Sequence, residues 1–136
     1  MKKEVFILDT NIWISYLLSK KYDTLVKIIL ENTFEIATCK NLVTEFEQVL
    51  QRKKFKKYIR QNEINEAVKI HLKLCKFIDI ELKANELTDR KDNYLLDLYR
   101  AAKASLLVTG DKQLHTEASK LGYKVITLAQ FENTAG

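Results

Sequence analysis

The sequence predicts a three-layer α/β sandwich in which helices flank a mostly parallel central sheet. Short runs of strand length alternate with longer segments of helical period, the pattern typical of such sheets. The first run, Val5–Leu8, is apolar throughout, as expected of a strand that is buried on both faces. The 136 residues contain no proline, three glycines and no linker-like stretch, so we expect a single domain over residues 1–136.

Five strands are expected, and each is short and rich in β-branched, aromatic or other apolar residues. In chain order they are Val5–Leu8, Phe34–Thr38, Phe77–Glu81, Leu106–Val108 and Lys124–Thr127. Ligands of open parallel sheets bind beyond the carboxyl ends of the strands. The residues that follow these strands are therefore the first place to look for a functional site.

Between the strands, apolar residues recur every three or four positions, which predicts helices with one buried face. Three stripes are clear: Leu42, Phe46, Val49 and Leu50; Ile64, Val68, Leu72 and Cys75; and Leu95, Leu96, Tyr99 and Ala102. Asn62, which precedes Glu63, is expected to cap the second of these helices. Gly122 is expected to end the helix before the last strand, because glycine readily adopts the left-handed conformation found after many helices.

The composition excludes a disordered or collagen-like chain, since 46% of the residues are hydrophobic and 30% are charged. The opening Met1–Glu4 is basic, but the four apolar residues that follow are fewer than the roughly 7–15 of a signal peptide. No run reaches the roughly 18 apolar residues of a membrane span. Cys39 and Cys75 are too few for a disulfide framework, so we expect reduced thiols in a cytoplasmic protein with no membrane association.

Four acidic residues stand where the predicted fold would bring them together. Asp9 and Asp111 each follow a predicted strand, whereas Glu45 and Asp92 lie at the edge of the apolar stripe of a helix. Each has an ordinary structural interpretation: an Asp can cap a helix or interact with its dipole, and a Glu at the rim can pair with a lysine. Four carboxylates at one end of a sheet would nevertheless repel one another strongly unless cations shared the site.

Mg²⁺ or Mn²⁺ is the cofactor that such a cluster predicts, because both ions favour oxygen ligands and keep waters for phosphate substrates. One or two such ions can orient an attacking water and stabilise the charge on a phosphate. The cluster therefore predicts phosphodiester hydrolysis. Its catalytic, metal-holding residues would be Asp9, Glu45, Asp92 and Asp111.

These residues resemble the motifs of the PIN-domain nucleases, and within them the VapC-like toxin branch of prokaryotic toxin–antitoxin systems. The family's opening strand and D-T-N motif are similar to Val5–Asn11, and its Glu-bearing helix is similar to Val43–Phe46. Its third acidic motif resembles Lys91–Leu98, and its V-T-G-D signature resembles Leu107–Lys112. The blocks occur in the family's order from the first strand to the last.

The resemblance implies a PIN-like sandwich and a metal-dependent endoribonuclease, with RNA as substrate, a small antitoxin protein as partner and a homodimeric assembly. It implies that Thr10, Asn11 and Thr109 support the four acids by hydrogen bonding. Two positions depart from the family's pattern. Gln113 stands where many relatives carry a fifth acid, and Leu128 lies where a proline is common.

Further residues near these motifs are assigned from their spacing. Asp97 lies one helical turn after Asn93, whose amide can pair with it, and both are expected to support the site. Asp79 and Asp89 are expected on the surface. In the apolar segment after Asn11, core packing is the ordinary interpretation of Trp13, Tyr16, Leu17 and Leu18, although the resemblance also allows a partner surface there.

A basic run offers a candidate RNA-binding surface. The net charge is +5, which favours polyanionic partners, but the location of the charges matters more than their sum. Six cations within nine residues have Phe55 and Tyr58 among them: Arg52, Lys53, Lys54, Lys56, Lys57 and Arg60. A solvated helix face is the plain interpretation. Because the run begins seven residues after Glu45, it can also contact RNA phosphates beside the site while an aromatic ring stacks on a base.

Other functions compete with a toxin nuclease. A PIN-domain RNA-processing nuclease that is not a toxin would carry the same motifs. A non-catalytic RNA-binding module would keep the fold and lose acids, whereas all four are present. A phosphorylated receiver domain needs paired acids after the first strand, and a D-x-D phosphatase needs an aspartate where Asn11 stands, so both are disfavoured.

Overall fold

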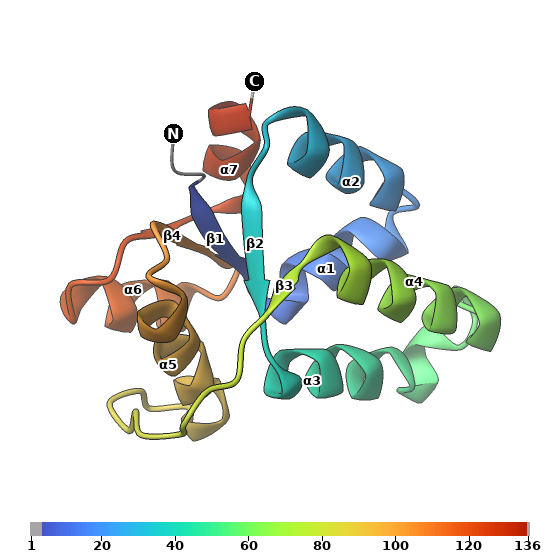
Figure 1. The fold of residues 1–136 in the computed structure, drawn as a ribbon. Coiled ribbons are helices and arrows are strands. Elements are labelled where there is room, and N and C mark those ends of the chain that lie inside the picture. The colour runs from blue at the N-terminus through green and yellow to red at the C-terminus, as the bar shows by residue number, and fades with distance from the viewer. Residues whose placement is uncertain (1–3, 136) are drawn as a thin grey trace.

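The computed structural model describes residues 4–135 and has a five-stranded parallel sheet at its centre (Figure 1). The order across the sheet is β3-β2-β1-β4-β5, and each pairing is parallel, which confirms the predicted sheet. The first three residues of the basic opening lie outside the described part. The strands are β1 (Val5–Leu8), β2 (Glu35–Thr38), β3 (Lys76–Phe77), β4 (Leu106–Val108) and β5 (Val125–Ile126).

Helices cover both faces of the sheet. They are α1 (Thr10–Leu18), α2 (Tyr22–Glu31), α3 (Lys40–Leu50), α4 (Gln61–Leu74), α5 (Asn93–Ala102), α6 (Lys112–Lys120) and α7 (Leu128–Ala135), with 3-10 turns η1 (Lys53–Phe55) and η2 (Arg90–Asp92). Right-handed crossovers place the β1–β2 and β2–β3 connections on one face of the sheet and the β3–β4 and β4–β5 connections on the other. Figure 1 accordingly shows α1–α4 on one side and α5 and α6 on the other, the predicted three-layer sandwich. Within residues 4–135, no helix combines the length and the apolar character that a membrane crossing requires.

Apolar side chains from these layers fill the core. Phe6–Leu8 of β1 have no exposed surface, and α3 buries Leu42, Phe46 and Leu50 against the interior, which confirms the first predicted stripe. Trp13 and Tyr16 of α1 are also buried, so their side chains belong to the core and offer no partner surface. Gly122 follows α6 with φ at 98°, the left-handed conformation expected of it.

The third strand is shorter than predicted. Expected over Phe77–Glu81, it consists of Lys76 and Phe77 alone. Its partner β2 ends at Thr38, and the chain turns there into α3, so residues 79–81 have no neighbouring strand to pair with. The chain instead leaves the sheet as a long loop that reaches η2.

The buried face of α4 is also different from the predicted stripe. Ile64, Ala67 and His71 are buried, whereas Leu72 is 46% exposed. The helix begins at Gln61, two residues earlier than a cap at Asn62 would require. The N–H of Arg60 donates to Glu63 Oε1 at 3.0 Å, so Asn62 lies inside the first turn.

His71 shows why a polar residue can occupy this face. Its ring has no exposed surface, and Nε2 lies 2.7 Å from Oγ1 of the equally buried Thr38, which ties α4 to the end of β2. Burial lowers the pKa of His71 to about 4, so the ring is neutral at pH 7. The hydrogen bond offsets the cost of burying two polar groups.

Replacing Thr38 by valine should therefore lower the free energy of unfolding by about 1–3 kcal/mol, because a buried ring nitrogen loses its partner. Urea unfolding measures this loss. Thr38→Ser keeps the hydroxyl and serves as the matched control, with a smaller expected loss. Equal destabilisation by both substitutions would show that the hydroxyl does not matter.

The register of the sheet brings the ends of β1 and β4 together. Leu8 lies opposite Val108, and the N–H of Asp9 continues the ladder by donating to the carbonyl of Val108 at 2.9 Å. These two strands lie where the connections change from one face of the sheet to the other, and a crevice forms at such a switch point. The residues just past the strands, Asp9 and Thr109, therefore stand side by side at this crevice.

Candidate active site

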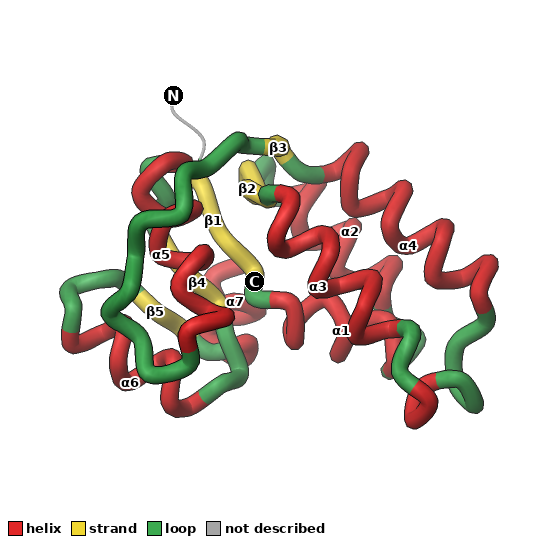
Figure 2. Tube along the Cα trace, turned by 90° about the horizontal axis from the view of Figure 1, so that it is seen from below, coloured by secondary structure: helices red, strands yellow, loops and turns green. Residues whose placement is uncertain are grey.

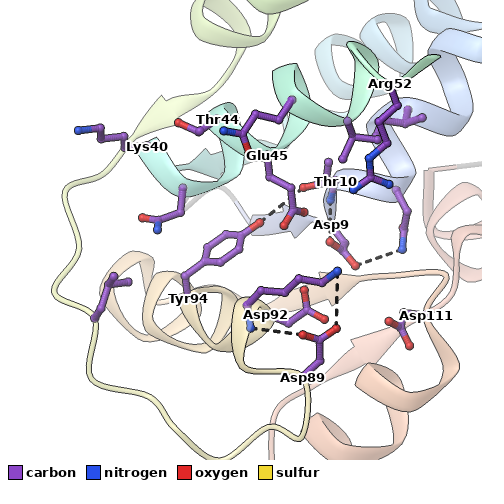
Figure 3. A pocket seen from close by; sticks show the side chains of 17 residues that line it. Asp9, Thr10, Lys40, Thr44, Glu45, Arg52, Asp89, Asp92, Tyr94 and Asp111 are labelled. Carbon is purple, nitrogen blue, oxygen red and sulfur yellow. Dashed lines mark hydrogen bonds and ion pairs between the residues drawn. The ribbon is translucent and has the colours of Figure 1, made fainter. Parts of the chain in front are cut away.

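A cavity of about 920 Å³ opens beyond the carboxyl ends of β1 and β4. It lies between one face of α3, the start of α1, the loop before η2 and the residues that follow β4. Figure 3 shows the side chains that line it. All four predicted acids are among them: Asp9, Glu45, Asp92 and Asp111.

Asp9 lies deepest in the cavity wall and is held on both carboxylate oxygens. Oδ1 accepts the N–H of Thr10 at 2.7 Å, which caps α1. Oδ2 accepts the hydroxyl of Thr109 at 2.7 Å and the amide of Asn11 at 3.2 Å. Asp9 is 5% exposed, so these three donors set the orientation of its carboxylate.

Asp111 combines its ordinary structural role with a place at the cavity. Its Oδ1 accepts the N–H groups of Gln113 at 2.9 Å and Leu114 at 3.1 Å, which caps α6. The helix therefore fixes the side chain through one oxygen. The residue at the same time lines the cavity opposite α3.

Glu45 and Asp92 have fewer partners than their ordinary interpretations require. Within residues 4–135, Glu45 makes no ion pair with any lysine, although it stands on the cavity wall. Asp92 occupies the N-cap position of α5 but makes no capping hydrogen bond, and it is 8% exposed. Neither carboxylate is explained by helix capping or surface ion pairing.

Burial and the neighbouring negative charges raise the pKa values of two of these carboxylates, Asp9 and Asp92. The pKa of Asp9 rises to about 6, chiefly through burial and then through the charges of Glu45 and Asp111, against the lowering effect of the bond from Thr109. Burial likewise raises the pKa of Asp92 to about 7, with the charge of Asp9 as the next cause. Negative charge is therefore costly in this cavity, and a bound cation would reduce that cost.

The donor chemistry of the cavity fits Mg²⁺ or Mn²⁺, since the acidic side chains supply oxygen ligands only. In the described part of the chain, no three acidic, histidine or cysteine side chains are close enough to enclose an ion by themselves. The four carboxylates instead line an open cavity. Such an arrangement suits a hard cation that keeps several of its own waters.

The predicted supporting residues divide into two groups. Thr10, Asn11 and Thr109 all contact Asp9 directly. Asn11 also accepts the N–H of Gly110 at 3.3 Å, which links the start of α1 to the loop after β4. These hydrogen bonds place all three residues beside Asp9, and their role in supporting a functional site stays a prediction.

Asn93 and Asp97 do not reach the cavity, and they do not pair with each other. Asn93 Oδ1 accepts the N–H of Leu87 at 2.9 Å, and the Asp97 carboxylate accepts those of Lys83 and Ala84. Both residues thus fasten α5 to the loop between β3 and η2, which Figure 2 shows in green running past α5. Their support of the site is indirect, through the loop that delivers Asp89 to the cavity.

The basic run lies just beyond α3 and forms a loop with the turn η1, not a helix face. Arg52 lines the cavity, whereas the lysines that follow it do not. The remaining cations of the run are exposed on the adjoining loop: Lys53, Lys54, Lys56, Lys57 and Arg60. Tyr58, between them, is 62% exposed.

Several residues line the cavity without having been predicted there. Asp89 is exposed, as expected, but it also lines the open cavity, and its carboxylate lies 3.9 Å from the ammonium of Lys91. Tyr94 also lines the cavity, and its hydroxyl lies 3.5 Å from the hydroxyl of Thr10. On α3 the cavity also includes Lys40, Asn41, Thr44 and Gln48. The helical period around Glu45 could have indicated these four, but the path of the loop that carries Asp89 has no such signal.

An acid-lined cavity at the switch point of a parallel sheet defines an α/β domain suited to metal-assisted chemistry on a bound ligand. The family model described as PIN domain matches residues 5–113, from β1 into α6. The matched segment covers most of the chain and includes all four acids. The chain therefore belongs to the PIN domain family, a family of nucleases.

Among solved structures, the chain is similar to one described as the crystal structure of VapBC2 from Rickettsia felis bound to a DNA fragment from their promoter. The TM-score is 0.61 at 17% sequence identity, and the match covers 90% of this chain and 98% of the other. The likeness confirms the PIN-like sandwich. No curated protein matches the chain in sequence.

Proposed function

We propose that the protein is a metal-dependent endoribonuclease that hydrolyses RNA phosphodiester bonds in this cavity. The observation that carries the proposal is the convergence of four carboxylates from separate elements on one cavity, in a member of a nuclease family. The raised pKa values of Asp9 and Asp92 reflect a cost of negative charge that a bound cation would reduce. The site residues are Asp9, Glu45, Asp92 and Asp111.

The four carboxylates would hold Mg²⁺ or Mn²⁺, which supplies positive charge to activate water and stabilise the phosphate. The protein itself holds the carboxylates in position. Thr109 and Asn11 orient Asp9, and the first turn of α6 orients Asp111. Cations on the cavity wall would bind substrate phosphates, and Lys91 is one of them.

We also propose that this nuclease is the toxin of a toxin–antitoxin pair, with a small antitoxin protein as partner and a homodimeric assembly. The likeness of its motifs to the VapC-like branch supports this, as does the similarity to a VapBC2 structure. Cys39 and Cys75 are buried free thiols, which suits a reducing compartment such as the cytoplasm.

Expression in a bacterial host tests the toxin proposal. Growth arrest by the wild type, relieved by co-expression of the neighbouring small gene and absent with Asp9→Asn, would support it. RNA cleavage without growth arrest would favour the second candidate, an RNA-processing PIN nuclease. RNA binding without cleavage in either metal would favour a non-catalytic module.

The exposed basic loop should contribute electrostatic affinity for RNA. Replacing Lys53, Lys54, Lys56 and Lys57 with glutamine should weaken binding and lower the slope of log affinity against log salt, by up to about 3 if each lysine meets a phosphate. Fluorescence anisotropy across a salt series measures both. The matched control variant replaces four exposed lysines on α2, α4 and α6 with glutamine: Lys27, Lys69, Lys73 and Lys120. Identical salt slopes for the two four-lysine variants would show that the basic loop is not part of the RNA-binding surface.

A further inference from the structure

One row of side chains on α3 runs along the cavity beside the carboxylates. Lys40, Thr44, Gln48 and Arg52 follow one another at intervals of four residues, and all four line the cavity. This spacing places Lys40, Thr44 and Gln48 along one side of α3, and Arg52 lies two residues beyond the end of the helix. In Figure 3, Lys40 and Thr44 follow one another along α3 and Arg52 lies past them, with Glu45 between the two cations. We name these four residues the α3 row.

The two cations of the α3 row are free to meet an anion. Both side chains are exposed. In the described part of the chain, neither Lys40 nor Arg52 takes part in an ion pair, although Glu45 and Glu47 lie on the same helix. Cations kept unpaired beside an acidic cavity are available for phosphate.

The order of charges along the α3 row is also informative. Cations stand at its two ends, separated by about 15 Å of helix from Lys40 to Leu50, and neutral hydrogen-bonding groups stand between them. The central residue Gln48 lies one turn after Glu45, where a lysine or arginine would pair with that carboxylate. Neutral groups in the middle thus leave Glu45 unpaired, while the terminal cations can still hold a polyanion across it.

We propose that the α3 row binds the backbone of single-stranded RNA across the carboxylate site. Lys40 binds a phosphate on one side of the cleaved bond and Arg52 a phosphate on the other, while Thr44 and Gln48 donate hydrogen bonds between them. Leu82, 65% exposed on the same cavity, offers apolar contact to an unpaired base. The Arg52 end continues into the basic loop. This inference rests on the proposed nuclease function.

Binding to a short fluorescein-labelled single-stranded RNA of mixed sequence tests the α3 row. The measurements use the Asp9→Asn background with Mg²⁺, so that binding is separated from cleavage. Lys40→Gln and Arg52→Gln should each weaken binding about fivefold and lower the salt slope by about 0.7. Thr44→Ala should weaken binding without changing the slope. The matched controls are Lys69→Gln and Lys73→Gln, exposed positions on α4 outside the cavity.

The two end cations should also be separable by position. When the RNA is trimmed from one end, one cation loses the phosphate that it binds, and replacing that cation should no longer weaken binding. Replacing the other cation should still weaken binding, because its phosphate is still present. Losses no greater than those of the α4 controls would overturn the α3 row as a binding track. Equal losses of affinity for both variants on every trimmed RNA would overturn it as well.

The outcome is distinct from that of the nuclease proposal. If the wild type cleaves RNA but Lys40→Gln and Arg52→Gln bind like the controls, the α3 row is overturned and the nuclease stands. If both variants bind weakly and the wild type cleaves nothing in Mg²⁺ or Mn²⁺, the track is supported and the nuclease is overturned.

Discussion

Replacing Asp9 by asparagine is expected to abolish RNA cleavage while the fold stays in place. Asparagine has the same shape and keeps one oxygen to accept the bonds that now come from Thr10 or Thr109, but it lacks the negative charge. Charge stabilisation by a held metal ion is worth several kcal/mol. Its loss should therefore slow cleavage by a factor on the order of 10³ or more.

The measurement is the rate of cleavage of a labelled RNA in Mg²⁺ and in Mn²⁺. Asp79→Asn is the matched control, since it makes the same chemical change at an exposed acid outside the cavity, and it should cleave like the wild type. Chelation with EDTA should reduce the wild type to the level of Asp9→Asn. Cleavage that persists in both the variant and EDTA would reject this metal centre.

A second large effect is expected on stability, where Asp9→Asn should make the metal-free protein more stable than the wild type at alkaline pH. The folded-state pKa of Asp9 is about 6, raised from 3.8 chiefly by burial. Below about pH 3 the carboxyl is protonated in both the folded and unfolded states, and its ionisation costs almost nothing. Between about pH 3 and 6 the unfolded chain ionises first, so the wild type loses stability as pH rises, and well above pH 6 the full cost remains.

A shift of about two pKa units corresponds to about 3 kcal/mol. The difference in unfolding free energy between Asp9→Asn and the wild type should therefore grow from near zero at about pH 3 to at most this value at about pH 8. Asp92, whose pKa is raised to about 7, acts in the same direction. Urea unfolding in EDTA at several pH values measures the difference. A difference in unfolding free energy that does not change with pH would contradict a charge effect.

Binding of a metal ion should offset the loss of stability that the ionised carboxylates cause. Mg²⁺ or Mn²⁺ should raise the Tm of the wild type more at about pH 8 than at about pH 4, because the ion binds ionised carboxylates and only the folded state presents them together. Asp9→Asn should gain much less. Asp79→Asn should behave like the wild type, since its acid is not part of the cavity.

The four acids could be predicted because each depends on local pattern. Asp9 and Asp111 end strands that are recognisable as short apolar runs, and Glu45 lies on a helix with a clear stripe. Parallel strands place their carboxyl ends together, so the acids after β1 and β4 converge in any fold of this class. The α3 row follows from the same helical period once the cavity is known to lie beside Glu45.

The role of Asn93 and Asp97 could not be predicted in this way. Their partners are backbone N–H groups of a loop with no periodicity, and spacing alone suggested that they would pair with each other. The same loop brings the exposed Asp89 to the cavity, which the sequence did not indicate. A loop's path is set by the many contacts that it makes after the sheet and helices have packed, and none of these contacts leaves a periodic signal.

The sequence by itself determined the sandwich, the order of its main elements and the four carboxylates, because hydrophobic period and strand ends are local properties. Only the tertiary structure decided that Arg52 alone of the basic run reaches the cavity, that β3 ends where β2 ends, and that burial raises the pKa values of Asp9 and Asp92. Burial, proximity and electrostatic repulsion are relations between residues distant in the chain. They arise only when packing brings those residues together.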